Sequence, residues 1–398
     1  MTDSLQLLRQ VPVRFLAVIG LSIAVPTVVC IYLTTGYLTR TDGLYDLSGN
    51  IVGGDFVNLW AAAQLAAQGN ANLIFDPDSF FSVQKEFFGD TFKRHLWSYP
   101  PHTLFLAAPF SAFPYLTALA LWCGLTIALF AASLRAAGFH WTILLIILLA
   151  PPSFINVFSG QNGFVTVALL VTGWTLKEDH PWWAGVMFGL LTFKPQLGFL
   201  IPVALVATRE WRPVISACLT TLALVAASAA VFGADVWPLY IQQILPAQTE
   251  FLSTEQGVAR WMAPTVYIAA RVLGQDAVTG YWIQVPFAVL AAGMIYQACR
   301  RRWRKDMQLA MLLTAPFLAA PWALNYEMTF VAVAAAILMK LALRNKPTAA
   351  EVVTAGAAWI LPLAVYPMNA AGVPLSPLIL LALILCIWKR AGGADELR

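Results

Sequence analysis

The chain has 398 residues, of which 60% are hydrophobic and only 11% are charged, and its formal net charge is +4. A soluble globular domain carries roughly 25% charged residues, so this composition excludes a single water-soluble domain. The small positive charge does not indicate nucleic-acid binding, because the basic residues stand at the ends of apolar segments. The cysteines lie within apolar runs and are odd in number, which argues against a disulfide framework, and the histidines lack metal-ligand spacing.

Apolar runs that suit membrane-spanning helices recur along the whole chain, so we predict one all-α polytopic membrane domain over residues 1–398. The first run follows Arg9 and Arg14. It is too long for a signal-peptide core and has no Ala-x-Ala cleavage pattern, which indicates a retained span. We expect about ten full spans, at residues 14–35, 115–134, 141–158, 163–176, 213–233, 281–299, 307–323, 327–343, 350–367 and 374–389.

The segment between the fourth and fifth expected spans does not suit a single crossing. Residues 182–208 contain two apolar pieces divided by Lys194-Pro195, and each piece is short for a full span. Basic residues flank the segment at both ends, Lys177 before it and Arg209 after it. We therefore predict a short helical hairpin that turns at Lys194-Pro195, which gives roughly twelve membrane segments in total.

The basic residues are distributed unequally between the two sides of this arrangement. With the amino terminus in the cytoplasm, 17 of the 24 Lys and Arg residues lie on the cytoplasmic side. Cytoplasmic loops carry the excess of basic residues, so both termini are predicted to be cytoplasmic. A single kinked helix at 182–208 would instead place Arg300-Arg301-Arg302 outside, which is less favourable.

Two long loops lie outside in this topology, at residues 36–101 and 234–280. Both are rich in aromatic residues, which are typical of amphipathic helices that lie in the membrane interface. We expect such helices at residues 56–68 and 80–87 in the first loop and at residues 258–273 in the second.

The centre of the first outer loop reads Gly53-Gly54-Asp55, followed directly by an apolar segment from Phe56 to Trp60. A carboxylate that follows two glycines, at the mouth of an otherwise apolar protein, is a candidate catalytic group. Asp is also a favoured N-cap residue, so Asp55 could instead only cap a helix that begins at Phe56. The motif by itself leaves both interpretations open.

Further polar groups stand beside different apolar segments, and the predicted topology places all of them on the outer side. Polar and ionisable groups at membrane depth are costly and commonly mark a substrate pathway. Each also has a structural explanation, since Gln161-Asn162 can end a helix and Tyr99-Pro100-Pro101 can form a rigid turn. The set comprises Asn58, Trp60, Tyr99, His102, Gln161, Asn162, Lys194, Gln196, Asn325, Tyr326 and Glu327.

Two charged motifs bear on anion and metal binding. Lys194 lies between two apolar pieces, away from the cytoplasmic surface, and needs an anionic partner, either a carboxylate such as Glu327 or a bound phosphate. Asp76-Pro77-Asp78 resembles the Asp-x-Asp metal motif of nucleotide-sugar enzymes, but its proline and the preceding apolar residues favour a turn. We therefore predict neither a metal site nor a cofactor.

The motifs also form a familiar series when they are taken in chain order from Gly53 to Arg212. They are Gly54-Asp55-Phe56 with Trp60, Phe75-Asp76-Pro77, Tyr99-Pro100-Pro101, Gly160-Gln161-Asn162, Lys194-Pro195-Gln196 and Arg209-Glu210-Trp211-Arg212, with a weaker echo at Ala320-Pro321-Trp322. This series resembles the polyprenyl-phosphate-sugar-dependent glycosyltransferases of the GT-C superfamily. Its closest resemblance is to the α-mannosyltransferase-like members, glycosyltransferase family 87.

The resemblance implies a GT-C fold and an inverting transfer of a sugar from a polyprenyl phosphate to an acceptor hydroxyl. It implies that Asp55 is the general base, and it places the donor phosphate near Lys194. Tyr99, Gln161, Asn162 and Gln196 would surround the sugar phosphate, and Asn58, Trp60, His102, Asn325, Tyr326 and Glu327 would line the substrate site. The family often has a histidine after its later Pro-x-x-Trp-like motif. This chain has none between Trp322 and Glu327, which makes Tyr326 and Glu327 candidate substitutes.

The same resemblance implies the partners and the location. The partners would be a lipid-linked sugar, a glycolipid or glycan acceptor and the bilayer, without nucleic acid. The site would face the periplasm from a bacterial inner membrane. Mannose is the commonest donor sugar in the family, and arabinofuranose or another hexose would suit the same motifs. The alternative is a transporter or lipid flippase, but such a protein should show internal repeats or ionisable residues spread across the bilayer, whereas here they cluster outside.

Overall fold

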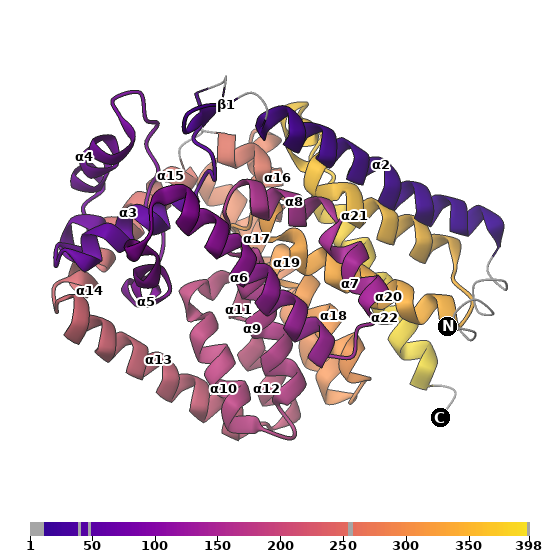
Figure 1. Cartoon of the computed structure of the whole chain (residues 1–398). Helices are drawn as coiled ribbons and strands as arrows, with labels where there is room; N and C mark the ends of the chain where they lie inside the picture. Colours follow the sequence, from indigo (N-terminus) through magenta and orange to yellow (C-terminus); the bar gives the residue numbers. More distant parts are fainter. Residues whose placement is uncertain (1–11, 39–40, 47–48, 254–257, 396–398) are drawn as a thin grey trace.

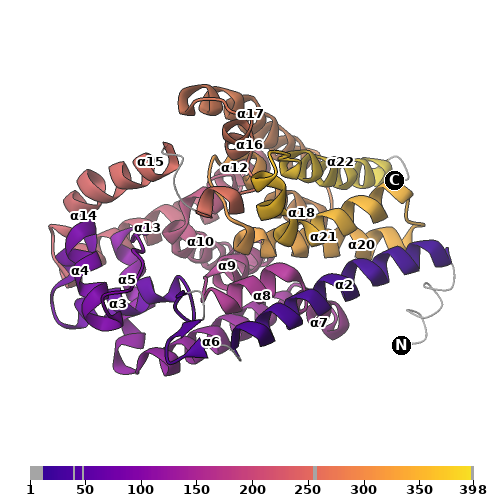
Figure 2. The ribbon, with the colours of Figure 1, turned by 90° about the horizontal axis from the view of Figure 1, so that it is seen from above.

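The computed structural model describes residues 12–38, 41–46, 49–253 and 258–395. The regular structure in these residues is helical, apart from an antiparallel pair of short strands, β1 (Thr41–Asp42) and β2 (Tyr45–Asp46). The all-α class predicted from the sequence is therefore confirmed. Figures 1 and 2 show the helices packed against one another in one body.

The first third of the chain contains two long helices separated by the first outer loop. The α-helices are α2 (Val13–Leu38), α3 (Phe56–Ala67), α4 (Pro77–Phe88), α5 (Leu104–Ala107) and α6 (Tyr115–Ala136), with short 3-10 helices η1 (Ala71–Phe75), η2 (Pro101–Thr103) and η3 (Ala108–Ala112). The backbone N–H of Ser79 donates to Asp76 Oδ1 at 2.7 Å, and Pro77 takes the first helical position. Asp76-Pro77-Asp78 was expected to form a turn, and it instead forms the start of α4, with Asp76 as the N-cap.

The middle third contains short helices and one long one. They are α7 (Trp141–Leu148), α8 (Pro151–Phe158), α9 (Gly163–Leu176), α10 (Pro181–Leu190), η4 (Leu191–Phe193), α11 (Pro195–Gly198), α12 (Ile201–Thr208) and α13 (Trp211–Phe232). The span expected at 141–158 is divided into α7 and α8, which are bent by 59°. The cause is Pro151. The residue before a proline avoids the helical conformation, and Ala150 is extended, with φ −71° and ψ 146°.

Residues 182–208 form the predicted hairpin. The helical path breaks at Lys194, and the chain then returns along α11 and α12. The two ends of the segment meet, because Lys177 Nζ lies 3.6 Å from Glu210 Oε1. A single continuous span would hold these two residues a membrane thickness apart. The hairpin prediction is therefore confirmed.

The last third begins with the second outer loop and ends in a group of packed helices. The elements are α14 (Val236–Leu239), a single π-helical segment η5 (Tyr240–Ile244), α15 (Leu245–Ser253), η6 (Val258–Met262), α16 (Val266–Val272), α17 (Ala277–Arg300), α18 (Lys305–Thr314), α19 (Pro316–Ala319), η7 (Asn325–Met328), α20 (Thr329–Arg344), α21 (Ala349–Ala370) and α22 (Ser376–Asp395). The span expected at 307–323 is broken, because Pro316 starts the new helix α19 and Ala320 is extended.

Six helical stretches in the described residues are long and apolar enough to cross a membrane, and the bent pair α7–α8 is a further candidate. The six are Val13–Tyr37, Tyr115–Ala136, Trp211–Phe232, Ala277–Arg300, Asn325–Arg344 and Ala349–Ala370. Other expected spans are short, since α9 has 14 residues and α18 has 10. The chain is a polytopic membrane protein in which several apolar helices are too short to cross alone.

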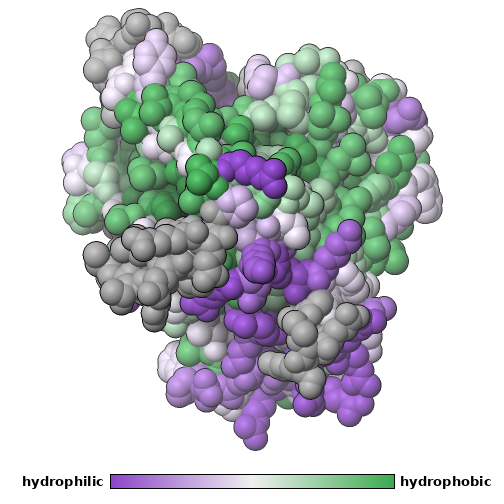
Figure 3. All heavy atoms as spheres, turned by 90° about the vertical axis from the view of Figure 1, so that its right-hand side faces the viewer, coloured by the Kyte–Doolittle hydropathy of each residue, from purple (hydrophilic) through white to green (hydrophobic). Residues whose placement is uncertain are grey.

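The long helices expose large apolar side chains, as a protein surrounded by lipid requires. Leu21 on α2, Leu125 on α6, Leu222 on α13 and Val289 on α17 are all more than half exposed. Both ribbon views place the start of α2 and the end of α22 at the same end of the molecule. Figure 3 looks at that end and shows hydrophilic side chains gathered in its lower part, below a largely apolar surface.

Part of each outer loop lies at the opposite end. Figures 1 and 2 both show α3, α4, α14 and α15 together on the left. We expected α3 to lie in the membrane interface, but most of its residues are buried, including Phe56, Val57 and Leu59. An amphipathic pattern shows that a helix has an apolar face, and here protein covers that face. This packing fixes the position of Asp55, which immediately precedes α3.

Candidate active site

Two glycine-containing turns, Gly53-Gly54-Asp55 and Ser159-Gly160-Gln161, lie side by side at the site. The backbone N–H of Asp55 donates to the Ser159 carbonyl at 3.0 Å. A Cβ atom on Gly160, where φ is +55°, would lie 2.4 Å from the Phe56 Cβ and 2.8 Å from the Gly53 carbonyl oxygen. Only glycine tolerates both this conformation and this approach. The contact brings Asp55 beside Gln161, although 106 positions separate them in the sequence.

Asp55 occupies the N-cap position of α3, but its side chain makes no capping hydrogen bond. Its carboxylate instead accepts two side-chain hydrogen bonds, from His95 Nδ1 to Oδ1 at 3.1 Å and from Gln161 Nε2 to Oδ2. The side chain remains 40% exposed because it faces an open cavity. The structure therefore shows no side-chain cap at Asp55, and the carboxylate is available to a ligand.

The charge state of Asp55 results from opposing influences. Burial of the carboxyl by surrounding protein raises its pKa, since it disfavours the ionised form. The hydrogen bond and charge of His95, the hydrogen bond from Gln161 and the positive charge of Lys194 lower it. The lowering influences outweigh burial, so the pKa of Asp55 lies below its ordinary value and the group is ionised at neutral pH.

His95 was missed by the sequence analysis. It lies in the segment between α4 and η2, 40 positions after Asp55, and no periodicity links the two. The one available signal was the polar run Lys93-Arg94-His95 within the first outer loop. Charged runs of this kind usually face solvent, so the run did not distinguish His95 from its neighbours.

Lys194 forms a buried ion pair with Glu327, with its Nζ atom 2.7 Å from Glu327 Oε1. The two side chains are only 4% and 3% exposed. The second carboxylate oxygen of Glu327 accepts the backbone N–H of Leu324 at 2.7 Å, and the ammonium also lies 5.2 Å from the centre of the Tyr326 ring. The anionic partner predicted for Lys194 is therefore Glu327.

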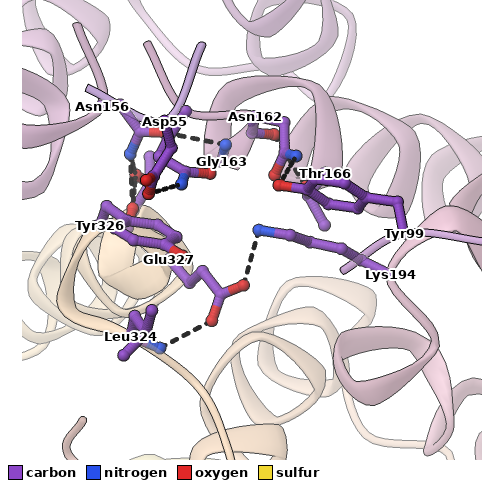
Figure 4. A network of polar contacts seen from close by, with 12 residues as sticks. Asp55, Tyr99, Asn156, Asn162, Gly163, Thr166, Lys194, Leu324, Tyr326 and Glu327 are labelled. Carbon is purple, nitrogen blue, oxygen red and sulfur yellow. Dashed lines mark hydrogen bonds and ion pairs between the residues drawn. The ribbon is translucent and has the colours of Figure 1, made fainter. Parts of the chain in front are cut away.

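Asn156 joins the two halves of the site and was also missed from the sequence. Its side-chain amide donates to the Tyr326 carbonyl and, at 2.9 Å, to the Thr329 hydroxyl. Its carbonyl oxygen accepts the backbone N–H of Gly163 at 2.8 Å. Figure 4 shows how these bonds connect the start of α9 to the turn that carries Glu327.

Tyr99 projects its ring into the same region. The side-chain amide of Asn162 donates to the Tyr99 hydroxyl at 2.9 Å. Burial raises the pKa of Tyr99, and the negative charge of Asp55 raises it further, whereas the bond from Asn162 lowers it by less. Tyr99 therefore keeps its hydroxyl proton at neutral pH and can donate it in a hydrogen bond to a ligand.

A cavity of about 1010 Å³ collects eight of the predicted site residues. It is lined by Asp55, Asn58, Tyr99, Gln161, Lys194, Gln196, Tyr326 and Glu327, together with His95 and parts of α15. The cavity is at the upper end of the range for small-molecule sites. It therefore has room for a sugar phosphate and for part of a second substrate. Within the described part of the chain, no group of three or more His, Cys, Asp or Glu side chains could hold a metal ion.

Four predicted residues lie outside the lining of this cavity. Asn162 donates to the Tyr99 hydroxyl but does not itself line the cavity. Trp60 donates its indole N–H to the Phe113 carbonyl at 2.9 Å and packs among aromatic rings. His102 is buried against Trp237, and burial lowers its pKa to about 4, so its ring is neutral. Asn325 donates to the Pro362 carbonyl at 3.1 Å.

A second cavity of about 490 Å³ lies beside the first and is almost entirely apolar. It is enclosed by α10, η4, α11, α12 and α13, and its lining includes Leu191, Phe199, Leu205 and Leu222. Pro195 contributes to the walls of both cavities. The residue that turns the hairpin therefore lies between a polar cavity and an apolar one.

Comparison with known proteins identifies the family. No curated protein and no solved structure matches the chain. One family model does, over residues 97–321, which is more than half of the chain. The matched region includes Tyr99, Gln161, Asn162 and Lys194 of the site, whereas Asp55, His95 and Glu327 lie outside it. The chain belongs to glycosyltransferase family 87.

Proposed function

We propose that the protein transfers a sugar, with inversion, from a polyprenyl-phosphate donor to an acceptor hydroxyl at the periplasmic face of a bacterial inner membrane. The observation that carries this proposal is that the Asp55 carboxylate and the Lys194 ammonium line one cavity of about 1010 Å³. A base and a cation around one space are what a single displacement at a sugar phosphate requires.

Asp55 is the general base in this proposal. As the acceptor hydroxyl oxygen bonds to the anomeric carbon, the bond from that carbon to the phosphate oxygen breaks, and its electron pair leaves with the phosphate. The hydroxyl proton passes to Asp55 and then to solvent. The lowered pKa of Asp55 suits this order of events. The attacking hydroxyl becomes strongly acidic only as its new bond forms, so the base need only be ionised and within reach.

The leaving phosphate gains negative charge in the transition state and needs positioned donors. Lys194 engages Glu327 with one of its three N–H groups, which leaves two for a phosphate in the cavity. Tyr99 lines the same cavity and adds a protonated hydroxyl. These donors are held in place by the protein before the substrate binds, and such preorganisation contributes several kcal/mol to catalysis.

The lipid part of the donor fits the apolar cavity. A donor with its phosphate beside Lys194 would continue past Pro195, the residue common to both cavities. Since a hydrocarbon chain needs no hydrogen-bond partners, the leucine- and phenylalanine-lined walls suit it. This arrangement favours a lipid-linked sugar over a water-soluble nucleotide sugar. Mannose, as the family's commonest donor sugar, is the sugar that we propose to test first.

The transporter alternative is not favoured. The match to a glycosyltransferase family argues for bond cleavage rather than for passage of an intact substrate. The buried Lys194–Glu327 pair and Asp55 also gather around one cavity, whereas a transport pathway distributes ionisable groups across the bilayer.

The first test compares Asp55→Asn with Asp90→Asn, using full-length protein and a radiolabelled polyprenyl-phosphate mannose. Asp90 is exposed in the same outer loop and serves as the matched control. Removal of a general base costs about 10²- to 10⁴-fold in rate. We expect Asp55→Asn to lose transfer to that extent and Asp90→Asn to retain it. Full transfer by Asp55→Asn would refute the catalytic assignment.

A further inference from the structure

His95 is held in one orientation by contacts on both its ring and its backbone. Its ring stacks on Phe92, with ring centres 5.4 Å apart and an angle of 30° between the ring planes. Phe92 stacks in turn on Phe88 at the end of α4. The aromatic stack leaves the imidazole little freedom to rotate away from Asp55, to which its Nδ1 atom is 3.1 Å distant.

A buried polar cluster fixes the backbone at the same position. The side-chain amide of Gln84, which is fully buried on α4, donates to the His95 carbonyl at 3.1 Å and to Asn58 Oδ1 at 2.8 Å. Asn58, on α3, donates to the Leu96 carbonyl at 3.4 Å. The His95–Leu96 segment is therefore attached to α3 and to α4. Asn58 was predicted to line the substrate site, and the structure gives it this supporting contact as well.

We propose that His95 is a positioning residue for Asp55, which orients the carboxylate toward the acceptor hydroxyl and maintains its ionised form. This inference rests on the proposed function, in which Asp55 is the base. His95 donates its Nδ1–H to Oδ1 while Gln161 donates to Oδ2, so the plane of the carboxylate is fixed by two separate donors. Each carboxylate oxygen still has a free lone pair for the substrate.

His95 makes the largest contribution to lowering the pKa of Asp55. Burial raises the pKa of Asp55, and the hydrogen bond and charge of His95 oppose it more than Gln161 or Lys194 does. Other ionisable groups also influence this carboxyl or share its cavity. They are Arg94 and Tyr99 from the segment between α4 and η2, Tyr115 from α6, Lys194 from the hairpin turn, Tyr240 from η5, Glu250 from α15, and Tyr326 and Glu327 from η7. In the described residues, the side chains that donate hydrogen bonds to the Asp55 carboxylate are those of His95 and Gln161. Loss of His95 should therefore change the ionisation of Asp55 more than loss of any of these other groups.

The kinetic test uses His95→Leu, which removes the Nδ1–H donor, and His95→Gln, which retains an amide donor. We expect His95→Leu to lower kcat by about 10- to 100-fold, because small misplacements of a catalytic group cost up to about 10²-fold. KM for the donor should change little. His95→Gln should lose less, and His180→Gln, an exposed histidine before α10, should behave as wild type.

The pH dependence separates positioning from a merely structural effect. A base with a lowered pKa works at all pH values above that pKa and fails as pH falls through it. In His95→Leu the pKa of Asp55 should rise, so the acid limb of the kcat profile should move up by about one pH unit. A fall in kcat with an unmoved acid limb, or wild-type kinetics throughout, would overturn the proposal.

A second measurement does not depend on sugar transfer. A water-soluble carbodiimide modifies only the protonated carboxyl, so the pH at which Asp55 is half-modified, read by peptide mass spectrometry, reports its ionisation directly. We expect this midpoint to be higher in His95→Leu than in wild type. An equal midpoint contradicts the His95 inference even if transfer is found. Absence of transfer by wild-type protein, with a shifted midpoint, contradicts the proposed function while the His95–Asp55 coupling stands.

Discussion

Lys194 and Glu327 are each only a few per cent exposed, so each charge depends on the other. Removing one member of a buried ion pair leaves the second charge without a partner and costs about 3–5 kcal/mol. We expect Lys194→Met to lower the temperature of thermal unfolding clearly and to abolish transfer. The double variant Lys194→Met/Glu327→Gln should recover stability but not transfer. Intrinsic tryptophan fluorescence on heating and the radiolabel assay would measure the two effects.

A surface ion pair provides the control for that experiment. Lys305 Nζ lies 2.6 Å from Glu178 Oε2, but the side chains are 51% and 44% exposed. Exposed pairs contribute about 0–1 kcal/mol, so Lys305→Met should change neither the unfolding temperature nor transfer appreciably. If Lys194→Met were as harmless as Lys305→Met, the ion pair would have no part in holding the site together or in binding phosphate.

The polar residues differed in how far sequence reasoning could identify them. Lys194 was predictable, because a lysine between apolar pieces must have an anionic partner, and Glu327 was named as one. His95 and Asn156 were not predictable. Their partners are 40 positions and more than 160 positions away, and no local pattern records such contacts. Trp60 was predictable as part of a motif, but whether an aromatic ring faces a cavity or a core depends on packing.

At the scale of elements, Gly160 determines how closely the two turns of the site approach. We expect Gly160→Ala to lower transfer by about 10²-fold, because the new Cβ would push against Phe56 and Gly53 and so displace Asp55 from Gln161. The measurement is kcat/KM for transfer, together with the unfolding temperature.

Gly138→Ala is the matched control for this prediction. Gly138 also has a positive φ, +81°, but a Cβ there would meet nothing within 4 Å. Both variants therefore incur the backbone strain of about 1–2 kcal/mol that a left-handed alanine carries, and only Gly160→Ala adds a collision. Equal losses of transfer in both variants would show that strain alone, and not the contact between the turns, is responsible.

Proline explains both the success and the failures of the element predictions. The hairpin was predictable because Lys194-Pro195 divides two pieces that are each too short to cross. The breaks at Pro151 and Pro316 fall within runs of full length, so hydropathy alone merged each pair of helices into one span. The burial of α3 was not predictable, because an apolar face may be covered by lipid or by protein with the same residues.

At the scale of the whole molecule, composition was sufficient to assign the protein to the membrane but not to order its helices. In the span that contains α20, 78% of the 18-residue apolar stretch is buried inside the protein, whereas in α13 the corresponding share is 11%. Hydropathy treats the two alike, since lipid chains are as apolar as leucine. The apolar helices are therefore divided between lipid-facing spans and an internal core, and this division leaves the apolar cavity between α12 and α13.

That cavity arises from unequal packing along the hairpin. α10 packs closely on α13, because Cβ atoms on Gly185 and Gly189 would lie 2.3 and 2.5 Å from Ser216 and Thr220. α12 packs mainly on α17 instead, so α12 and α13 diverge. The resulting space of about 490 Å³ has room for roughly three five-carbon isoprene units, if each heavy atom takes about 30 Å³, the share of a water molecule in the liquid.

The cavity predicts a dependence of KM on the length of the donor chain. With wild-type protein in detergent, KM should fall as the prenyl chain is extended from one to about three units, since each buried CH₂ contributes up to about 0.8 kcal/mol. Cys218→Trp, which fills a position in the cavity wall on α13, should weaken that dependence and raise KM for a long-chain donor about tenfold, which corresponds to about 1.4 kcal/mol.

Leu219→Trp is the control, because Leu219 is the next residue on α13, is 57% exposed and does not line the cavity. If both tryptophan variants changed KM alike, the lipid chain would lie elsewhere on the membrane surface of the protein. A selective effect of Cys218→Trp would instead connect the lipid chain to the hairpin turn at Pro195, and so to the ammonium group of the residue immediately before it.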